Sequence, residues 1–283
     1  MVAVAGALLA AAPARADIAI LTQPAVAQYA QVVEGYRGVA AAPVVDVEDA
    51  SALEALLARA PTVVVAVGRK AFDVALARAT RSAIVAAGVL APDAQGRADV
   101  TAVPLEVRAA DAVAALAALA PRARRVVAVH GPDGGQAVAD ALAAARKQGF
   151  EVDLRPFSDE ASFRWAFLGY LQNHDAIWLL PDARLAKPDL VHFMARACTE
   201  RRVALMGFLE GMTRAGALLS VAADLPGIGR EAARLAADVA SRPPEKRQNI
   251  PFRFAAGRVV VNDRVRATTA LGGTLPRDAE VIR

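Results

Sequence analysis

The sequence predicts an α/β protein built from two units, each a mostly parallel sheet with helices between its strands. Residues 62–67 are the clearest strand, because they form a continuous, mostly β-branched run, typical of a parallel strand covered on both faces. Gly68 breaks this run, and from Arg69 the apolar residues recur at helical spacing. The same order of strand, loop and helix returns several times along the chain, and this repetition predicts the fold class.

The first unit occupies the chain as far as residue 107. Its expected strands are residues 18–21, 44–47, 62–67 and 82–87. The helices expected after the first three strands are residues 26–39, 51–60 and 69–79. Residues 101–107 form an extended segment, interrupted by Pro104, that leads out of this unit.

The second unit repeats the pattern. Its expected strands are residues 125–130, 151–155, 176–180, 203–206 and 217–221. Its expected helices are residues 109–119, 136–148, 158–171 and 187–201. A long amphipathic helix is expected over 227–240, then a hairpin of 252–254 and 258–261 turning at 256–257, and a last helix over 262–271.

Composition limits the possible partners. The net charge of +4 comes from basic residues scattered among acids, with only 5% aromatic residues. Nucleic-acid binding normally needs a clustered basic surface with aromatic side chains, so we expect no nucleic-acid partner. Cys198 is the only cysteine, which excludes an internal disulfide and a thiolate metal cluster.

The first sixteen residues are apolar and end in Ala14-Arg15-Ala16 before Asp17, a small-x-small cleavage pattern. They predict a secretory signal peptide, residues 1–16, and export to a periplasm. The alternative is an N-terminal structural helix. This stretch is too short to span a bilayer, and no later apolar run is long enough.

Short sequence features occur along the chain in the order typical of one known family. They include Gly216-Ala-Leu-Leu-Ser220, then Asp224 and Gly229 opening a helix that ends before Arg242-Pro-Pro. Other matching pieces are residues 67–75, 121–126, 149–151, 175–182, 250–251, 259–262 and 270–276. In this order the chain resembles the ABC-transporter substrate-binding protein family, in its branch with a type I periplasmic-binding fold.

The resemblance implies two Rossmann-like lobes joined by a hinge of three chain crossings, with a small ligand held between them. It also implies delivery of the ligand to an ABC permease in the inner membrane. On this sequence we expect the crossings near Glu106, Ala223 and Gln248. Lobe one would then comprise residues 17–106 and 224–248, and lobe two residues 107–223 and 249–283.

The candidate ligand-binding residues are those at the predicted strand ends, where open α/β sheets bind ligands. They are Thr22, Gln23, Gly68, Arg69 and Lys70 in lobe one, and His130, Asp182, Phe208 and Glu210 in lobe two. Arg69 or Lys70, beside a helix N-terminus, suits a carboxylate or another anion, whereas Asp182 and Glu210 suit an amine. An amino-acid-like zwitterion follows as a possible ligand. The alternative for Arg69 and Lys70 is a solvated surface turn.

Motifs for cofactors and catalysis are weak or missing. Gly227-Ile-Gly229-Arg-Glu-Ala232 matches a dinucleotide fingerprint, but no strand-ending acid follows about twenty residues on, so we interpret it as a helix start. The loop 131–135 lacks the lysine and hydroxyl of a P-loop, and its alternatives are a ligand-approach turn and a plain loop. The three histidines have no metal-ligand spacing, and no nucleophile elbow occurs. We therefore expect no cofactor, no metal and no enzyme activity.

The leading hypothesis is a periplasmic solute-binding protein of an ABC importer, acting as a monomer and closing its lobes on the ligand. Two alternatives remain. One is a ligand-sensing subunit of a membrane receptor that does not transport. The other is an enzyme on a two-lobed α/β fold, which would need a catalytic constellation that the sequence does not display.

Overall fold

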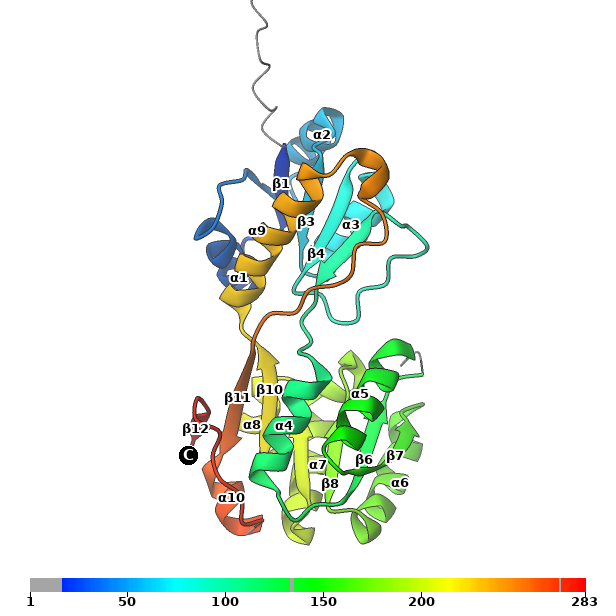
Figure 1. Cartoon of the computed structure of the whole chain (residues 1–283), viewed down its shortest axis with the longest axis vertical. Helices are drawn as coiled ribbons and strands as arrows, with labels where there is room; N and C mark the ends of the chain where they lie inside the picture. The colour runs from blue at the N-terminus through cyan, green and yellow to red at the C-terminus, as the bar shows by residue number, and fades with distance from the viewer. Residues whose placement is uncertain (1–16, 133–134, 270) are drawn as a thin grey trace, which may run out of the picture.

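The computed structural model describes residues 17–132, 135–269 and 271–283. The predicted signal peptide lies outside the described residues, as do positions 133–134 of the loop 131–135 and position 270 at the end of the last predicted helix. The described chain forms two α/β lobes, one above the other in Figure 1, joined by three stretches of chain. No helix in these described ranges is both long and apolar enough to cross a membrane.

Lobe one contains a five-stranded sheet in the order β2-β1-β3-β4-β5, with every neighbouring pair parallel. Its strands are β1 (Ile18–Thr22), β2 (Val44–Asp46), β3 (Val63–Val67), β4 (Ala83–Ala87) and β5 (Val100–Val103). Its helices are α1 (Ala27–Arg37), α2 (Ala50–Arg59), α3 (Arg69–Arg78), α9 (Leu225–Ser241) and the short η2 (Pro244–Lys246).

The central strand β3 shows why the sequence folds this way. Its five residues are all buried, as the continuous apolar run predicts for a strand covered on both faces. Val63, Val65 and Val67 pack into the apolar cluster beneath α1 and α9. The residues between them, Val64 and Ala66, pack into the cluster beneath α2 and α3.

Lobe two contains a seven-stranded sheet in the order β12-β11-β10-β9-β8-β6-β7. Its strands are β6 (Arg125–His130), β7 (Glu151–Pro156), β8 (Ala176–Leu179), β9 (Ala204–Gly207), β10 (Leu219–Ala223), β11 (Gly257–Asn262) and β12 (Glu280–Ile282). Its helices are α4 (Ala109–Leu119), α5 (Gly135–Lys147), α6 (Glu160–Asn173), η1 (Ala183–Ala186), α7 (Pro188–Arg201), α8 (Glu210–Arg214) and α10 (Asp263–Thr269). Apolar clusters fill both faces of the sheet, one against α4 and α5 and the other against α6, α7 and α8.

The predicted hairpin over residues 252–261 is wrong. β11 pairs antiparallel with β10 instead, with Leu219 opposite Val261. This pairing is the only antiparallel one among the described strands. Residues 251–256 form no regular strand and run along β5 of lobe one. There the Arg253 N–H donates to the Ala102 carbonyl at 2.9 Å.

The third crossing therefore lies near Ala256, beyond the expected position at Gln248. Ile250 and Ala255 are buried in the lobe-one cluster, so the segment 249–255 packs with lobe one rather than lobe two. The first crossing follows β5, and the second joins β10 directly to α9. The Asp224 N–H donates to the Ala256 carbonyl at 3.2 Å, so the second and third crossings lie side by side.

The two glycines of the sequence Gly227-Ile-Gly229 lie inside the first turns of α9, as a helix start predicts. α9 packs on α1 at very short range. A Cβ atom on Gly229 would lie 1.9 Å from the Val32 carbonyl oxygen, and one on Gly35 would lie 2.1 Å from the Pro226 carbonyl oxygen. Glycine is needed at both positions because the two helix backbones touch there.

Candidate functional site

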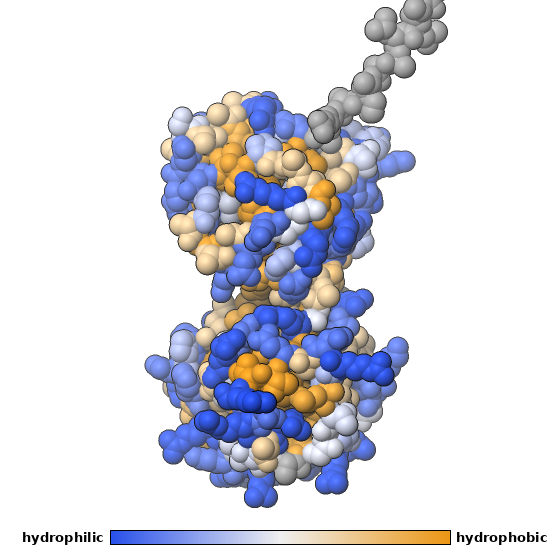
Figure 2. Space-filling view, turned by 90° about the vertical axis from the view of Figure 1, so that its left-hand side faces the viewer, coloured by the Kyte–Doolittle hydropathy of each residue, from blue (hydrophilic) through white to orange (hydrophobic). Residues whose placement is uncertain are grey.

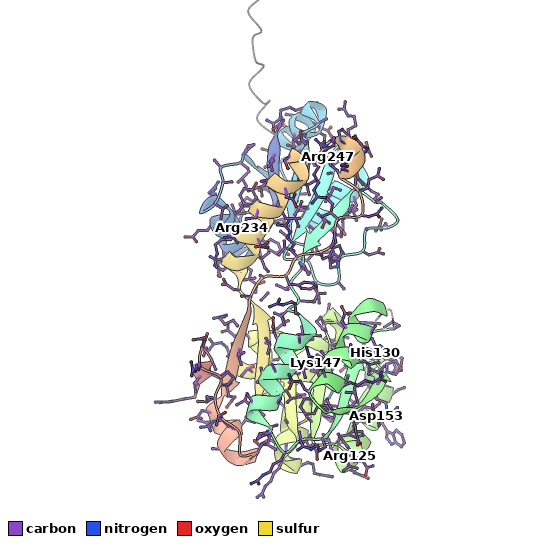
Figure 3. The ribbon with its side chains drawn as sticks, viewed as in Figure 1. Arg125, His130, Lys147, Asp153, Arg234 and Arg247 are labelled. Carbon is purple, nitrogen blue, oxygen red and sulfur yellow. The ribbon has the colours of Figure 1, made fainter. Side chains whose placement is uncertain are left out.

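The carboxyl ends of the parallel strands in both sheets face the space between the lobes. The crossings leave from the ends of β5 in lobe one and β10 in lobe two, and the other parallel strands of each sheet point the same way. Figure 3 shows this for β6, which runs from Arg125 at the far end to His130 on the side of lobe one. In Figure 2 the molecule narrows to a waist between the lobes. This is the edge where an open α/β sheet binds small ligands.

On the lobe-one side, Gly68 forms the turn between β3 and α3 with a φ of 86°, and its N–H donates to the Ala87 carbonyl at 3.0 Å. Lys70 follows in the first turn of α3. The carboxylate of Glu48 accepts a hydrogen bond from Lys70 Nζ at 2.5 Å and another from Gln23 Nε2 at 3.0 Å. The bond from Lys70 holds the pKa of Glu48 below its usual range.

Arg69 is engaged with a neighbouring loop of lobe one. Its guanidinium donates to the carbonyl oxygens of Leu90 at 2.5 Å and Ala91 at 3.4 Å, and it lies 3.7 Å from the carboxylate of Asp73. Arg69 and Lys70 are each about half exposed, at 49% and 50% of the side chain. Both cations thus lie at the predicted edge of the sheet and have partners within the protein. This arrangement also agrees with the alternative, in which Arg69 and Lys70 belong to a solvated surface turn.

Thr22 lies at the end of β1, and its side chain is buried within lobe one. It is 1% exposed and lines a small pocket beneath α1 together with Ala30, Val33 and Val44, with a volume of about 200 Å³. Its hydroxyl has no hydrogen-bond partner among the described residues. The two-residue period of a strand puts Thr22 on the same face of the sheet as buried Ile20. The sequence alone could therefore have predicted that Thr22 is buried.

On the lobe-two side, His130 and Asp182 come together where β6 and β8 end. The ring Nδ1 of His130 lies 2.6 Å from the Gly131 carbonyl, which accepts, so this nitrogen carries a proton. Asp182 is 13% exposed and accepts from the backbone N–H of Arg184 at 2.8 Å and from its guanidinium at 2.9 and 2.5 Å. These bonds hold the pKa of Asp182 below its usual range.

Gly131 allows the Asp182 carboxylate to lie directly against the backbone. A Cβ atom at Gly131 would be 2.0 Å from Asp182 Oδ2. The Arg184 guanidinium also lies over the ring of Phe157, 5.7 Å from its centroid. The end of lobe two therefore presents a carboxylate and a guanidinium side by side, fixed against a glycine backbone.

The main contacts of Phe208 and Glu210 are with residues other than His130 and Asp182. Phe208 is buried in the apolar cluster beneath α6 and α7. Glu210 begins the short helix α8, which was not predicted, and pairs with Arg214 at 2.6 Å and with Arg258 of β11. The hydrogen bond from Arg214 lowers the pKa of Glu210. Glu280 of β12 also pairs with Arg258, at 2.7 Å, so Glu210 belongs to a surface ion-pair network.

No protein-family model and no curated protein matches the sequence, but solved structures match its fold. The ligand-free, open structure of CD0873, a substrate-binding protein from Clostridium difficile, matches with a TM-score of 0.69 and 13% identity. That match covers 94% of this chain and 98% of the other. An ABC domain in complex with L-Trp from Streptococcus pneumonia matches with a TM-score of 0.60 and 19% identity over 94% and 100% of the two chains.

The chain has the type I periplasmic-binding fold. The predicted resemblance and fold class are confirmed at this level. A LacI transcriptional regulator from a Rhodococcus species also matches, with a TM-score of 0.54, 14% identity and coverage of 93% and 100%. The periplasmic-binding fold is therefore shared by solute-binding proteins and repressors, and at these identities the likeness defines the fold alone.

Two residues at this edge were missed by the sequence analysis. Arg184 stands two positions after Asp182, and that close spacing of opposite charges was a readable signal. Glu106 was expected only as the position of a crossing. One of its carboxylate oxygens accepts from the Ala91 N–H, and the other is buried without a partner among the described residues. The described ranges contain no cluster of three or more His, Cys, Asp or Glu side chains that could hold a metal.

Proposed function

We propose that this protein is a solute-binding protein that is exported to the periplasm, takes up a small molecule between its lobes and delivers it to an ABC permease. The observation that carries the proposal is that the carboxyl ends of the parallel strands in the two sheets face each other across a three-crossing hinge. A ligand that touches both edges stabilises the closed arrangement by its differential affinity for it. We propose no catalytic role for these edges.

The apolar start of the sequence supports the solute-binding protein over a repressor with the same fold. Residues 1–16 end in a small-x-small pattern, as expected of a secreted protein. The scattered basic residues and the low aromatic content give no support to a DNA-binding role.

The charges at the lobe-two edge support a ligand that carries both an amine and a carboxylate. Asp182 can accept a further hydrogen bond from an ammonium group, since a carboxylate has about four lone-pair sites, and its pair with Arg184 places a positive charge beside it that attracts a carboxylate. An amino-acid-like zwitterion would match both groups at once. One of the similar structures holds L-Trp, which is in keeping with this class of ligand.

The function is tested by identifying the ligand and measuring closure. Mass spectrometry of protein purified natively from its host should detect a bound small molecule, and calorimetry should confirm its affinity. Small-angle scattering with saturating ligand is then expected to give a smaller radius of gyration than the empty protein, because the waist between the lobes closes. Binding with an unchanged radius would contradict closure, and no binding of any amino acid or sugar would contradict the solute-binding proposal.

Replacing Asp182 with asparagine is expected to weaken ligand binding by about tenfold or more, because one charge-assisted hydrogen bond of roughly 1.5–3 kcal/mol is lost. The matched control is Asp189→Asn, at an exposed position in the first turn of α7, which should leave the affinity unchanged. Calorimetry on both variants measures the difference. Equal ligand affinities of the two variants would show that Asp182 does not bind the ligand. They would leave the result of the closure experiment unaffected.

A further inference from the structure

The loop between β4 and β5 connects the two lobes through a side chain. Leu90, at the start of this loop, is half-buried and packs against the lobe-two apolar cluster that contains Phe208 and Met212. Leu90 itself belongs to lobe one, since the Leu105 N–H beside it donates to the Val89 carbonyl at 3.0 Å. The lobes are thus in apolar contact in addition to the three crossings.

Two charged side chains hold this loop. Glu106, in the first crossing, accepts from the Ala91 N–H with an N···O distance of 2.5 Å. Arg69, at the start of α3, donates to the carbonyl of Leu90 at 2.5 Å. Ala91 has a φ of 44°, a left-handed conformation that a residue other than glycine keeps only where its surroundings fix it. The loop backbone is therefore hydrogen-bonded both to Glu106 of the first crossing and to Arg69 of lobe one.

The carboxylate of Glu106 is poorly placed for a negative charge. Its second oxygen is buried and has no partner among the described residues. Burial outweighs the hydrogen bond from Ala91 and the attraction of Arg69, and it raises the pKa of Glu106 above its usual range. On the neighbouring elements, Arg69 faces Asp73 on α3, and Arg108 pairs with Asp111 at the start of α4.

We propose that Leu90, Ala91, Glu106 and Arg69 form a latch that holds the two lobes in one orientation, and that ionisation of Glu106 loosens it. The latched state buries the carboxyl group, whereas hinge motion that withdraws Leu90 would expose it to water. A proton is bound more strongly in the state with the raised pKa, so acid favours the latched state. As the pH rises through the pKa of buried Glu106, the uncompensated charge is formed and the latched state loses stability.

The latch is tested in the ligand-free protein by interlobe distance measurement. Spin labels are attached at Thr80→Cys in lobe one and Lys147→Cys in lobe two, both exposed positions. Native Cys198 is buried, and burial raises its thiol pKa, so it resists labelling. Pulsed electron paramagnetic resonance then gives the distance distribution at a lower and a higher pH, about 5 and about 8.

We expect the native distribution to be narrow at the lower pH and clearly broader at the higher pH. Glu106→Gln retains an oxygen that accepts from Ala91 but carries no charge, so its distribution should stay narrow at both pH values. Leu90→Ser should be broad at both, because the apolar contact is lost. Glu34→Gln, which changes an exposed carboxylate on α1, should behave like the native protein.

Two results would overturn the proposal. One is a native distribution with the same width at both pH values. The other is a Glu106→Gln distribution that broadens with pH as the native one does. Circular dichroism establishes that each variant is folded, and Glu106→Gln keeps the size of the native side chain, so misfolding cannot imitate either result. Because no ligand is added, the outcome is independent of the proposed solute-binding function.

Discussion

Replacing Gly229 with alanine is expected to lower the free energy of unfolding by about 3 kcal/mol, at the upper end of the usual cost of overpacking. The new Cβ would meet the Val32 carbonyl at 1.9 Å and the Tyr36 backbone nitrogen at 2.6 Å. Both are backbone atoms of α1, so no side chain can turn aside and the two helices must separate. Separation would open the apolar cluster that Ile228 and Leu235 fill beneath α9.

Urea unfolding followed by circular dichroism measures this loss. The matched control is Gly169→Ala in α6, a helical glycine whose new Cβ would have none of the described residues within 4 Å apart from its own helix backbone and chain neighbours. That change should stabilise the protein by roughly 0.5–1 kcal/mol, because alanine is the better helix former. A Gly229→Ala variant as stable as the native protein would show that the close approach of α1 and α9 is incorrect.

Replacing Gly68 with alanine is expected to cost about 3 kcal/mol, through two effects. The backbone at Gly68 has a φ of 86° and a ψ of 165°, a region open almost solely to glycine, with a strain of roughly 1–3 kcal/mol for other residues. In addition, the new Cβ would lie 2.3 Å from the ring of Tyr29. The ring belongs to a side chain that can move, so this part of the cost is displacement of Tyr29 from its packed position.

A second glycine separates the two effects. Gly96 has a similar φ of 80°, but beyond its chain neighbours no residue in the described part of the chain lies within 4 Å of the new Cβ. Gly96→Ala should therefore show backbone strain alone and a smaller loss. Tyr29→Ala combined with Gly68→Ala should recover part of the loss, with a coupling energy of roughly 1 kcal/mol. Melting curves of these three variants and of Tyr29→Ala alone measure both the backbone strain and the coupling energy. Equal losses for Gly68→Ala and Gly96→Ala would exclude the contact with Tyr29.

The order of strands and helices followed from the sequence because each is encoded locally. The run from Val63 to Val67 is apolar at every position, and the structure buries every position. The alternation of such runs with helices is enough to predict parallel sheets, since parallel strands need crossover connections. The short helix α8 escaped prediction because five residues are too few to show a helical period.

The errors occurred where a segment is fixed by residues far along the chain. Residues 252–254 alternate as a strand does, which predicted a hairpin. In the structure Arg253 pairs with Asp238 of α9 at 2.6 Å and its backbone bonds to β5, so the segment stays with lobe one. Neither partner is adjacent in sequence, and local alternation carries no information about them.

The same reasoning applies to the candidate site. The sequence placed Arg69 and Lys70 at a strand end, and the structure agrees. It could not show that Arg69 binds the carbonyl of Leu90, or that Glu210 pairs with Arg258. Those contacts join elements that meet only in the folded chain, and they determine how much of each charge is available to a ligand.

The return of the chain to lobe one after lobe two has consequences for synthesis. The apolar face of β3 and β4 is covered by α9, which follows β5 only after most of lobe two has been made. At about 5–20 residues per second, that face waits roughly 10–30 seconds for its cover. Lobe one is therefore completed late on the ribosome, and a nascent chain that stops within lobe two leaves an exposed sheet face that is prone to aggregation. Under the export proposed above, a chain that completes lobe one late would stay unfolded long enough to be threaded across a membrane.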